Sequence, residues 1–456
     1  MKKINRKYLF GDEFSEKMLK TAESMNFFSN KKLSIKTFDN AVVLPAKSFS
    51  YASVPWAKGG VLDCSGGYIE ESASFAMNSN KVNEGVQTRL YGAYPYEHEE
   101  IETYNDNMVL YAGFYIQQWG HFLLECISRL YPIVQNPEKY KDMKIVFLPM
   151  MDSDEIDGTY LELLNLIGIR KEQILLLRKP TRFKKIIIPE SSIYAGYVYT
   201  KEYKSLINRI ISKAMEKPVK IKTHKKIYLS RKNWDSTQDR DIGEDKIENF
   251  FNQNGFKSVS LEQYSLVEQI HLLQGADHVA SAICTLPHNL IFARDGINAI
   301  FINKMCKYNI LQFLVDDMKN LDVIYIDAYS TLLLCNSGVG PFLFDVNENL
   351  INYAKDNGMK LSKQEARGKD IIKYLDLCFE KIEDFTDEEL FVFRNLYKIM
   401  RSRFQLYSNY SKRELMVKKY FHKIMWKLSL GKKNFHLEKY IKYKMKLNKM
   451  KEMYYQ

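Results

Sequence analysis

Three short segments of the chain place polar side chains at spacings that could serve a transfer reaction. In the first, residues 120–134, apolar residues recur at helical spacing, and His121, Glu125 and Arg129 fall at every fourth position. Such a stripe can offer a titratable group for proton transfer in a cleft. Taken alone, the pattern favours a solvated helix face on which Glu125 and Arg129 form an ordinary ion pair.

The second segment follows an expected strand over residues 226–231. Ser230, Arg231 and Lys232 fall where that strand ends, and ligands of open α/β sheets bind beyond the carboxyl ends of the strands. A guanidinium group at that place can grip a diphosphate through paired hydrogen bonds. A charged turn between a strand and a helix fits the same residues.

The third segment, residues 280–296, runs from a strand into Thr285, Pro287, His288 and Asn289. Proline is favoured in the first turn of a helix, and free N–H groups at such a start bind anions. The side chains of Thr285, His288 and Asn289 could add hydrogen bonds to the same anion. The alternative is a capped helix in which His288 is a satisfied polar group.

Alternating strands and helices must position these segments. Short runs rich in β-branched residues predict strands, and apolar residues at helical spacing predict helices between them. The expected strands are 144–149, 173–177, 183–189, 226–231, 278–283 and 298–303, and the expected helices are 160–169, 243–256 and 265–276. This rhythm indicates an α/β protein, and in its first part a mainly parallel sheet.

The length and composition limit the classes of protein that fit. A chain of 456 residues exceeds the size at which single cores stop growing, roughly 250–300 residues, so we expect a lobe at 1–215, a second lobe at 216–386 and a tail at 387–456. The six cysteines lack CxxC spacing, which indicates neither a zinc site nor a disulfide framework. There is no secretory signal pattern, so we expect a cytoplasmic protein.

The positive charge is concentrated near the end of the sequence. The net charge is +12, and residues 401–456 alone hold 16 Lys or Arg against 3 acidic residues. Basic residues interleaved with large apolar ones favour an anionic membrane surface. Nucleic-acid binding and a helical bracket with a lysine-rich outer face are the alternatives.

Four sequence pieces, taken in order, resemble glycosyltransferase family 61, most closely the bacterial members of capsular polysaccharide biosynthesis. They are WGHFLLECISRL at residue 119, IYLSR at 227, SLVEQIHLLQGAD at 265 and LPHNLIFA at 286. Single pieces are short, and their order and spacing over roughly residues 105–350 carry the resemblance.

The resemblance implies a GT-B fold, in which two Rossmann-like lobes face a cleft and the C-terminal lobe holds a nucleotide sugar. It also implies inversion at the anomeric carbon without a bound metal or cofactor. We then expect Glu125 or His121 to act as the base, with Arg129 orienting Glu125. Without a metal, cations and main-chain N–H groups must stabilise the departing diphosphate. Arg231, helped by Lys232, and the main chain around Thr285–Asn289 are the candidates.

The same resemblance extends the list of expected donor contacts and partners. Ser230, Thr285, His288 and Asn289 join the donor site, and Glu268 either contacts the ribose or only packs its helix. The acceptor is expected to be a lipid-linked or surface polysaccharide at the inner face of the plasma membrane, with no nucleic acid bound. Pyruvyl or phosphosugar transfer on a similar fold, and a non-catalytic basic adaptor, are the competing functions.

Overall fold

The computed structural model describes most of the chain up to residue 361. The described ranges are 3–48, 57–75, 88–96, 98–105, 108–150, 155–194, 198–233, 240–330 and 340–361, with a few single positions between 370 and 395. The predicted tail at 387–456 therefore lies almost entirely outside the described residues. Within the described ranges, no helix combines the length and apolar character needed to cross a membrane.

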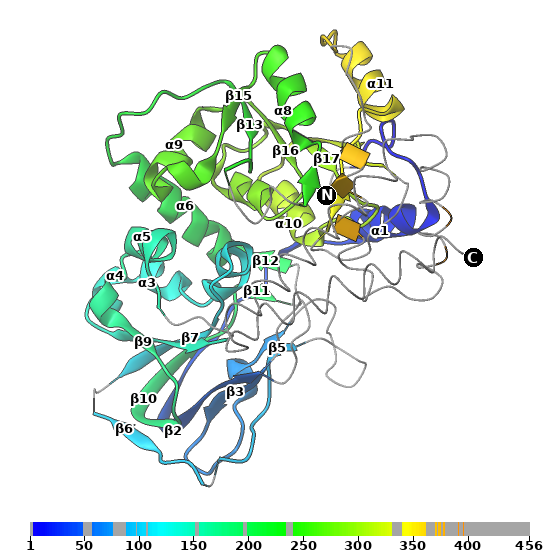
Figure 1. Ribbon diagram of the computed structural model, residues 1–456. Helices are drawn as coiled ribbons and strands as arrows, with labels where there is room; N and C mark the ends of the chain where they lie inside the picture. Colours follow the sequence, from blue (N-terminus) through cyan, green and yellow to red (C-terminus); the bar gives the residue numbers. More distant parts are fainter. Residues whose placement is uncertain are drawn as a thin grey trace, which may run out of the picture.

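A nine-stranded mixed sheet forms the lower part of the molecule in Figure 1. Its parallel half consists of β10 (Thr181–Pro189), β7 (Val109–Tyr115), β8 (Lys144–Pro149) and β9 (Ile174–Leu176). Its other half starts with β2 (Ile35–Ser48), which pairs antiparallel with β10. The strands predicted at 144–149, 173–177 and 183–189 lie in the parallel half. The antiparallel pairing was not predicted, because a long-range contact brings in a strand from the start of the chain.

The remaining strands of this part are short. β3 (Ala57–Leu62) pairs antiparallel with β2. Each of the other strands is two or three residues long. These are β4 (Ser74–Phe75), β5 (Thr88–Leu90) and β6 (Glu102–Tyr104) in the nine-stranded sheet, and β1 (Phe28–Ser29), β11 (Ile193–Tyr194) and β12 (Val198–Thr200) in a separate three-stranded sheet.

A five-stranded sheet forms the upper part, and all its strands are parallel. The order is β15 (Lys257–Val259), β13 (Lys226–Leu229), β16 (His278–Ala282), β17 (Asn298–Asn303) and β18 (Asp322–Asp327). The strands predicted at 226–231, 278–283 and 298–303 are confirmed. Sequence order therefore reverses direction between β13 and β16, which makes this gap the topological switch point of a doubly wound sheet.

Alternate side chains of the five-stranded sheet enter two different cores, as the period of a strand requires. One face packs against α9 (Leu266–Gly275), the 3-10 helix η5 (Leu286–Phe292) and α10 (Ile310–Met318). The other face packs against α8 (Glu244–Gln253) and α11 (Glu348–Asp356). Coverage of both faces explains why these strands read as almost continuous apolar runs.

Helix α6 (Lys201–Met215) lies between the two sheets (Figure 1). It packs against α3 (Tyr131–Gln135) and α5 (Gly158–Ile167) of the nine-stranded part, and against α9 and η5 of the five-stranded part. Its buried residues belong to one hydrophobic cluster that continues into both sheets. The two sheets are therefore joined by a common core and not by a hinge of solvated chain.

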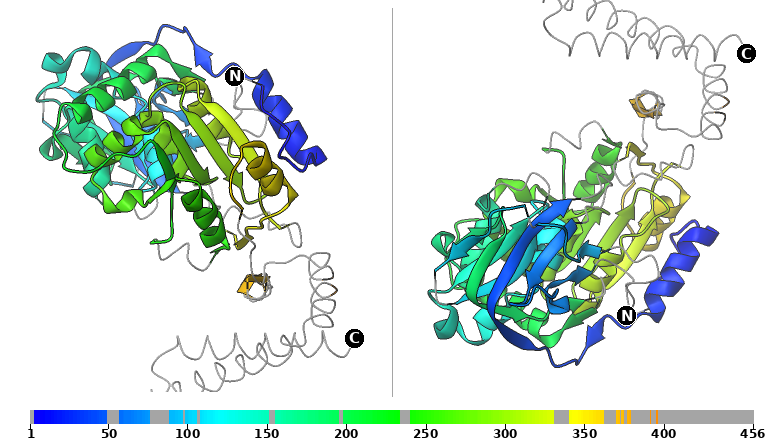
Figure 2. Two further views of the ribbon diagram at one scale, coloured as in Figure 1. Left: turned by 90° about the horizontal axis from the view of Figure 1, so that it is seen from above. Right: turned by 90° about the horizontal axis from the view of Figure 1, so that it is seen from below.

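The first described residues cross to the far sheet before they reach β2. The Asp327 N–H donates to the main-chain oxygen of Tyr8 (2.9 Å), and the Phe10 N–H donates to the Asp327 carboxylate (2.8 Å). Both views of Figure 2 place the next helix, α1 (Glu13–Ser24), along the β18 side of the five-stranded sheet. We call residues 3–24 the N-terminal arm.

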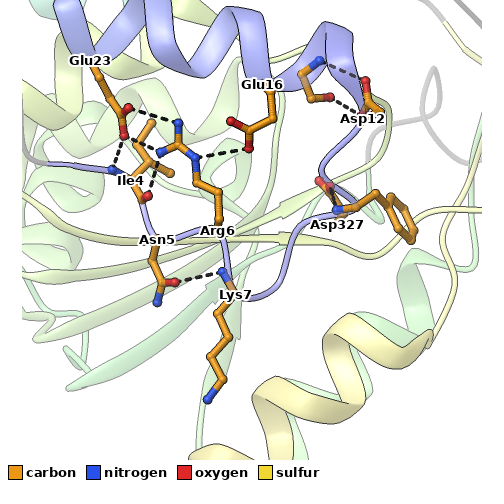
Figure 3. A network of polar contacts seen from close by, with 10 residues as sticks. Ile4, Asn5, Arg6, Lys7, Asp12, Glu16, Glu23 and Asp327 are labelled. Atoms are coloured by element: carbon orange, nitrogen blue, oxygen red, sulfur yellow. Dashed lines mark hydrogen bonds and ion pairs between the residues drawn. The ribbon is translucent and has the colours of Figure 1, made fainter.

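Polar contacts fix the shape of the N-terminal arm (Figure 3). The Arg6 guanidinium pairs with Glu23 and, at 3.3 Å, with Glu16, while the Ile4 N–H donates to Glu23 (2.7 Å). Asp12 caps α1 by accepting from the Ser15 N–H (2.9 Å). These contacts fold the arm back on itself, so that Tyr8 is presented to the sheet.

We predict that Tyr8 is the main apolar anchor of the arm. Its side chain is buried in the core between β18 and α11, and its hydroxyl donates to Asp356 (2.7 Å). Tyr8→Ala should lower the free energy of unfolding in urea by about 3–5 kcal/mol, as other large-to-small core changes do. Tyr8→Phe should cost only about 1 kcal/mol.

The matched control is Phe14→Ala on the same arm, where the side chain is 53% exposed. It should change the free energy of unfolding by less than about 0.5 kcal/mol. Equal losses for Tyr8→Ala and Phe14→Ala would show that the arm is not part of the core.

Candidate functional site

A cavity of about 330 Å³ opens at the switch point of the five-stranded sheet. One wall comes from the loops beyond the carboxyl ends of β13 and β16 and from the residues around α9. Its members are Arg231, Leu261, Glu262, Gln269, Thr285, Leu286 and Asn289. The opposite wall consists of residues that come after β7 and residues in the first turn of α5. They are Gln117, Gln118, Trp119, Thr159 and Tyr160. The cavity thus has one wall from each sheet.

Arg231 lies beyond the end of β13, lines the cavity and is held by a buried carboxylate. Its guanidinium is 3.2 Å from one oxygen of Asp241, and the Lys304 ammonium is 2.9 Å from the other oxygen. All three side chains are at least nine-tenths buried. Burial lowers the pKa of Arg231, but Cys284, Asp241 and Glu244 together raise that pKa above its ordinary value. The guanidinium therefore stays charged.

Sequence reasoning missed Lys304 and Asp241. Lys304 directly follows β17, so the rule that drew attention to Arg231 applies to it as well. Asp241 lies in β14 (Asp241–Ile242), which pairs with β19 (Phe342–Leu343), far along the chain. No local pattern announces that pairing.

A second buried carboxylate, Glu244, opens α8 next to this group. Burial and the charge of Asp241 raise its pKa to about 7, while Lys304 and Arg231 oppose that rise. The Tyr228 hydroxyl donates to it at 3.3 Å. The charge of the whole cluster therefore changes near neutral pH.

Two of the predicted donor contacts, Ser230 and Lys232, face Glu248 of α8. The Ser230 hydroxyl donates to Glu248 at 2.9 Å, and the Lys232 ammonium is 3.4 Å from the same carboxylate. The Lys232 side chain is 64% exposed. Neither residue is among those that line the cavity. The structure therefore brings Arg231 to the cavity without its two neighbours.

Glu268 caps its own helix. Its carboxylate accepts from the N–H (3.0 Å) and the hydroxyl (2.9 Å) of Ser265, and the Ser265 hydroxyl accepts in return from the Glu268 N–H (3.3 Å). This reciprocal pair is a capping box at the start of α9. Of the two alternatives for Glu268, the contacts favour the one in which it serves its helix.

The segment after β16 contributes Thr285 and Asn289 to the lining of the cavity. Asn289 uses both ends of its amide within the protein: its oxygen accepts from the Trp119 indole N–H (2.8 Å), and its nitrogen donates to the Leu286 oxygen (2.8 Å). The expected helix at this place is η5, a 3-10 helix of 7 residues. Asn289 thus joins the two cavity walls.

His288 lies beneath this loop, only 2% exposed. Its Nδ1 is 2.9 Å from the Gln312 amide oxygen, and its Nε2 is 3.2 Å from the Asn309 amide nitrogen. A proton on Nδ1 and a lone pair on Nε2 satisfy both contacts. Burial lowers the pKa of His288 to about 4, with a further lowering by His121 and an opposing hydrogen bond to Gln312. The imidazole is therefore neutral, and both of its nitrogens have protein partners.

The hydrogen-bond chain continues from His288 into the five-stranded sheet. The Gln312 amide donates to Asp316 at 2.9 Å, and the Tyr325 hydroxyl donates to the other oxygen of Asp316 at 2.5 Å. Burial raises the pKa of Asp316 to about 7. This chain orients the amide of Gln312, and Gln312 in turn fixes the tautomer of His288.

The helical segment after β7 is not the single helix expected over 120–134. It starts as α2 (Trp119–His121), continues as one π-helical turn (Phe122–Cys126), and resumes as α3 after a turn. Across this π-helical turn the side chains of His121 and Glu125 contact each other, with Nδ1 of His121 against the Glu125 carboxylate. Both side chains are partly buried, at 15% and 12% exposed, and neither lines the cavity itself.

Arg129 points away from that pair into the core of the nine-stranded part. Its guanidinium donates to the main-chain oxygens of Pro189 and, at 2.6 Å, Ala73, and lies 5.6 Å from the ring centre of Tyr111. The π-helical turn changes the phase of the helix, so the every-fourth-residue stripe does not persist. The structure therefore joins His121 with Glu125 but places Arg129 elsewhere, among main-chain acceptors.

Gly120 brings the two walls into contact. A Cβ atom at this position would lie 2.6 Å from the Thr285 methyl carbon and 3.2 Å from Cδ2 of His288. Only a residue without a side chain permits this approach. The spacing of the Trp119 wall from the Thr285 wall therefore depends on Gly120.

Comparison with known proteins places this site in a family. The model of the family described as Glycosyltransferase 61 matches residues 119–300, which begin at Trp119 in one cavity wall and end in β17. Over this segment the chain is similar to glycosyltransferases. The match confirms the resemblance to glycosyltransferase family 61 seen in the sequence, and no curated protein matches the chain.

We predict that Gly120→Ala forces the two walls apart. The new methyl group meets the Thr285 methyl carbon well inside contact distance, and such overpacking costs about 1–3 kcal/mol. Thr285→Ser removes that methyl carbon and keeps the hydroxyl, so the double variant should recover most of the loss. Urea unfolding of the two single variants and the double variant measures this, and additive losses would contradict the contact.

We also predict that His288 contributes pH-dependent stability. The folded state holds a proton on this imidazole only below about pH 4, whereas an unfolded histidine holds one below about 6.5. Stability from His288 is therefore lost as the pH falls through that window, by about 3 kcal/mol in total. The destabilisation caused by His288→Gln should be largest at pH 7 and shrink by roughly 2–3 kcal/mol at pH 4.5.

The measurement is urea unfolding of parent and variant at both pH values, because their difference cancels the other titrating groups. The control is His271→Gln on α9, whose ring contacts the Ala214 (3.2 Å) and Lys217 (3.1 Å) oxygens. A His288→Gln effect that stays constant with pH would show that the buried ring is not held neutral.

Proposed function

We propose that the protein transfers a sugar from a nucleotide-sugar donor to a hydroxyl of a growing, lipid-linked surface or capsular polysaccharide, with inversion at the anomeric carbon. The observation that carries the donor side is Arg231, which lines the cavity at the switch point and is held with Lys304 on Asp241. In doubly wound sheets this is the place where nucleotides and other phosphorylated ligands bind.

The cations suit the leaving group of such a reaction. In a single displacement, the acceptor oxygen forms a bond to the anomeric carbon while the bond from that carbon to the diphosphate oxygen breaks. Negative charge then grows on the departing diphosphate, and fixed cations in a buried site stabilise it. Arg231 is in position for this role from the cavity wall, and Lys304 supports it from behind Asp241. We propose that the reaction requires neither a metal nor a cofactor.

The proton of the acceptor hydroxyl must go to a base. The His121–Glu125 pair is our candidate, because the two side chains contact each other and begin two residues beyond Trp119 in the cavity wall. Either residue can accept the proton while the other orients it or shares the resulting charge. Thr285, next to Gly120, is the candidate for a direct hydrogen bond to the donor.

The arrangement in the cell is part of the same proposal. A GT-B arrangement of two lobes divided near residue 215 agrees with α6 ending at Met215 before the five-stranded sheet begins. The basic residues of 401–456 supply the attraction to an anionic membrane, at about 1 kcal/mol for each residue near the surface. The protein then works in the cytoplasm at the inner face of the plasma membrane.

We predict that Arg231→Ala abolishes both donor binding and transfer. The parent should be stabilised thermally by one member of a panel of UDP-, GDP-, CMP- and TDP-sugars, in EDTA as well as in Mg²⁺, by about 2.7 kcal/mol at 100 times its Kd. Arg231→Ala should lose that stabilisation and at least 100-fold in kcat/KM, about 2.7 kcal/mol of transition-state stabilisation.

Two further variants separate binding from folding. Arg231→Lys keeps a cation beside Asp241 but loses the forked geometry, so it should fold and still transfer poorly. Arg294→Ala removes an arginine that pairs with Asp277 at the opposite end of the same sheet, and should retain parental activity. If no nucleotide sugar stabilises the parent, the donor assignment is wrong.

A further inference from the structure

The wall of the cavity that comes from the nine-stranded part is aromatic. Trp119 and Tyr160 line the cavity, with ring centres 5.7 Å apart and ring planes at 74°. Phe122 lies behind both rings, at 6.3 Å from Trp119 and 5.0 Å from Tyr160. Tyr115 adds a further edge contact to Tyr160 at 6.1 Å. We call Trp119 and Tyr160 the aromatic wall.

The aromatic wall is fixed before any ligand enters. The Trp119 indole N–H donates to Asn289 at 2.8 Å, so the ring cannot turn without breaking that bond. Tyr160 belongs to α5 and is packed between Tyr115 and Phe122. Rings that are already ordered bind a ligand without the entropy cost of immobilising them.

The polar groups beside the wall carry no charge. Gln117, Gln118 and Thr159 line the same side of the cavity, and they offer amide and hydroxyl groups. Burial raises the pKa of Tyr160 to about 12, so its hydroxyl is neutral as well. Arg231, which is a cation, lies on the other wall, and Glu262 of that wall is acidic.

A neutral sugar ring matches this wall chemically. The C–H bonds of a pyranose form an apolar face with slight positive charge, which packs on the negative face of an aromatic ring. Its rim of hydroxyls needs uncharged donors and acceptors of the kind that surround the wall. Among the described residues that line this side of the cavity, none is a cation that could pair with a uronic or otherwise anionic sugar.

We propose that the aromatic wall is an acceptor subsite that binds the face of a neutral hexose unit in the acceptor glycan. This inference rests on the proposed function for its reaction, and it names the acceptor chemistry. Trp119 begins the helical segment that carries His121 and Glu125. A ring stacked on the wall therefore presents its hydroxyls beside the candidate base and across the cavity from Arg231.

A nucleobase could also stack on these rings, and the experiment must distinguish the two ligands. The probes are methyl glycosides of neutral hexoses, methyl glucuronide and the free nucleotide of the donor panel. Saturation-transfer NMR reports sugar binding without requiring turnover, and thermal shift reports nucleotide binding. Failure of the proposed function would appear as the absence of any nucleotide shift, while sugar contact with the wall would still be seen.

The matched variants are Tyr160→Leu, which removes the ring, and Tyr160→Phe, which keeps it. Tyr160→Leu should raise the Kd of the neutral methyl hexosides at least 10-fold, and Tyr160→Phe should leave it within about 3-fold. Both should keep the parental nucleotide shift, and methyl glucuronide should bind less well than the neutral hexosides to the parent. Trp119→Phe gives a second test, because it retains a smaller aromatic ring and removes the bond to Asn289.

Three results would overturn the proposal. One is saturation transfer to none of the neutral hexosides in the parent protein. Another is an unchanged hexoside Kd in folded Tyr160→Leu. The last is loss of the nucleotide shift in Tyr160→Leu with sugar binding intact, which would assign the wall to the base of the donor.

Discussion

The close approach of Gly120 to the loop after β16 sets the geometry of the whole site. It holds the aromatic wall of the nine-stranded part at a fixed spacing from Thr285 and His288 of the five-stranded part. The hydrogen bond from the Trp119 indole N–H to Asn289 fixes the orientation of the ring in that contact. Helix α6 extends the same junction, because its buried face shares one core with both sheets. The cavity is thus shaped by packing, which is stiff, and needs no ligand to bring its walls together.

The electrostatics of the cavity follow from burial in the same way. Asp241 contacts both buried cations, and without it Arg231 and Lys304 would repel each other in a poorly solvated place. Glu244, with its pKa near 7, adds a second negative charge only when it is ionised. An anion near Arg231 would favour the protonated form of Glu244, since its negative charge would repel the ionised carboxylate. Anion binding and the protonation of Glu244 are therefore linked.

The sequence allowed three strands of the five-stranded sheet and two of its helices to be predicted. Its strands are buried on both faces and its helices are amphipathic, so β13, β16, β17, α8 and α9 each show a local pattern. The capping box of Ser265 and Glu268 was missed, although Ser-x-x-Glu before an apolar run is its usual pattern. The antiparallel half of the nine-stranded sheet was not predicted either, because β2 owes its place to β10, and no local pattern reveals a partner so distant along the chain.

The candidate site was likewise predictable only where a local sequence pattern marks its residues. Arg231 and Thr285 follow strand ends, a position that sequence rhythm reveals, whereas the Asp241–Lys304 contact and the Trp119–Tyr160 wall join residues that only the fold brings together. The stripe of His121, Glu125 and Arg129 shows how local regularity can mislead. A single π-helical turn separates it into an ionisable pair near the cavity and an arginine in the core. Burial lowers the pKa of Arg129, because it penalises the charged form. The main-chain oxygens of Pro189 and Ala73 offset this penalty by accepting hydrogen bonds from the guanidinium. That arginine therefore ties the segment after β7 to the end of β10 and to Ala73, and it holds in place the helix start on which Trp119, Gly120 and the His121–Glu125 pair depend.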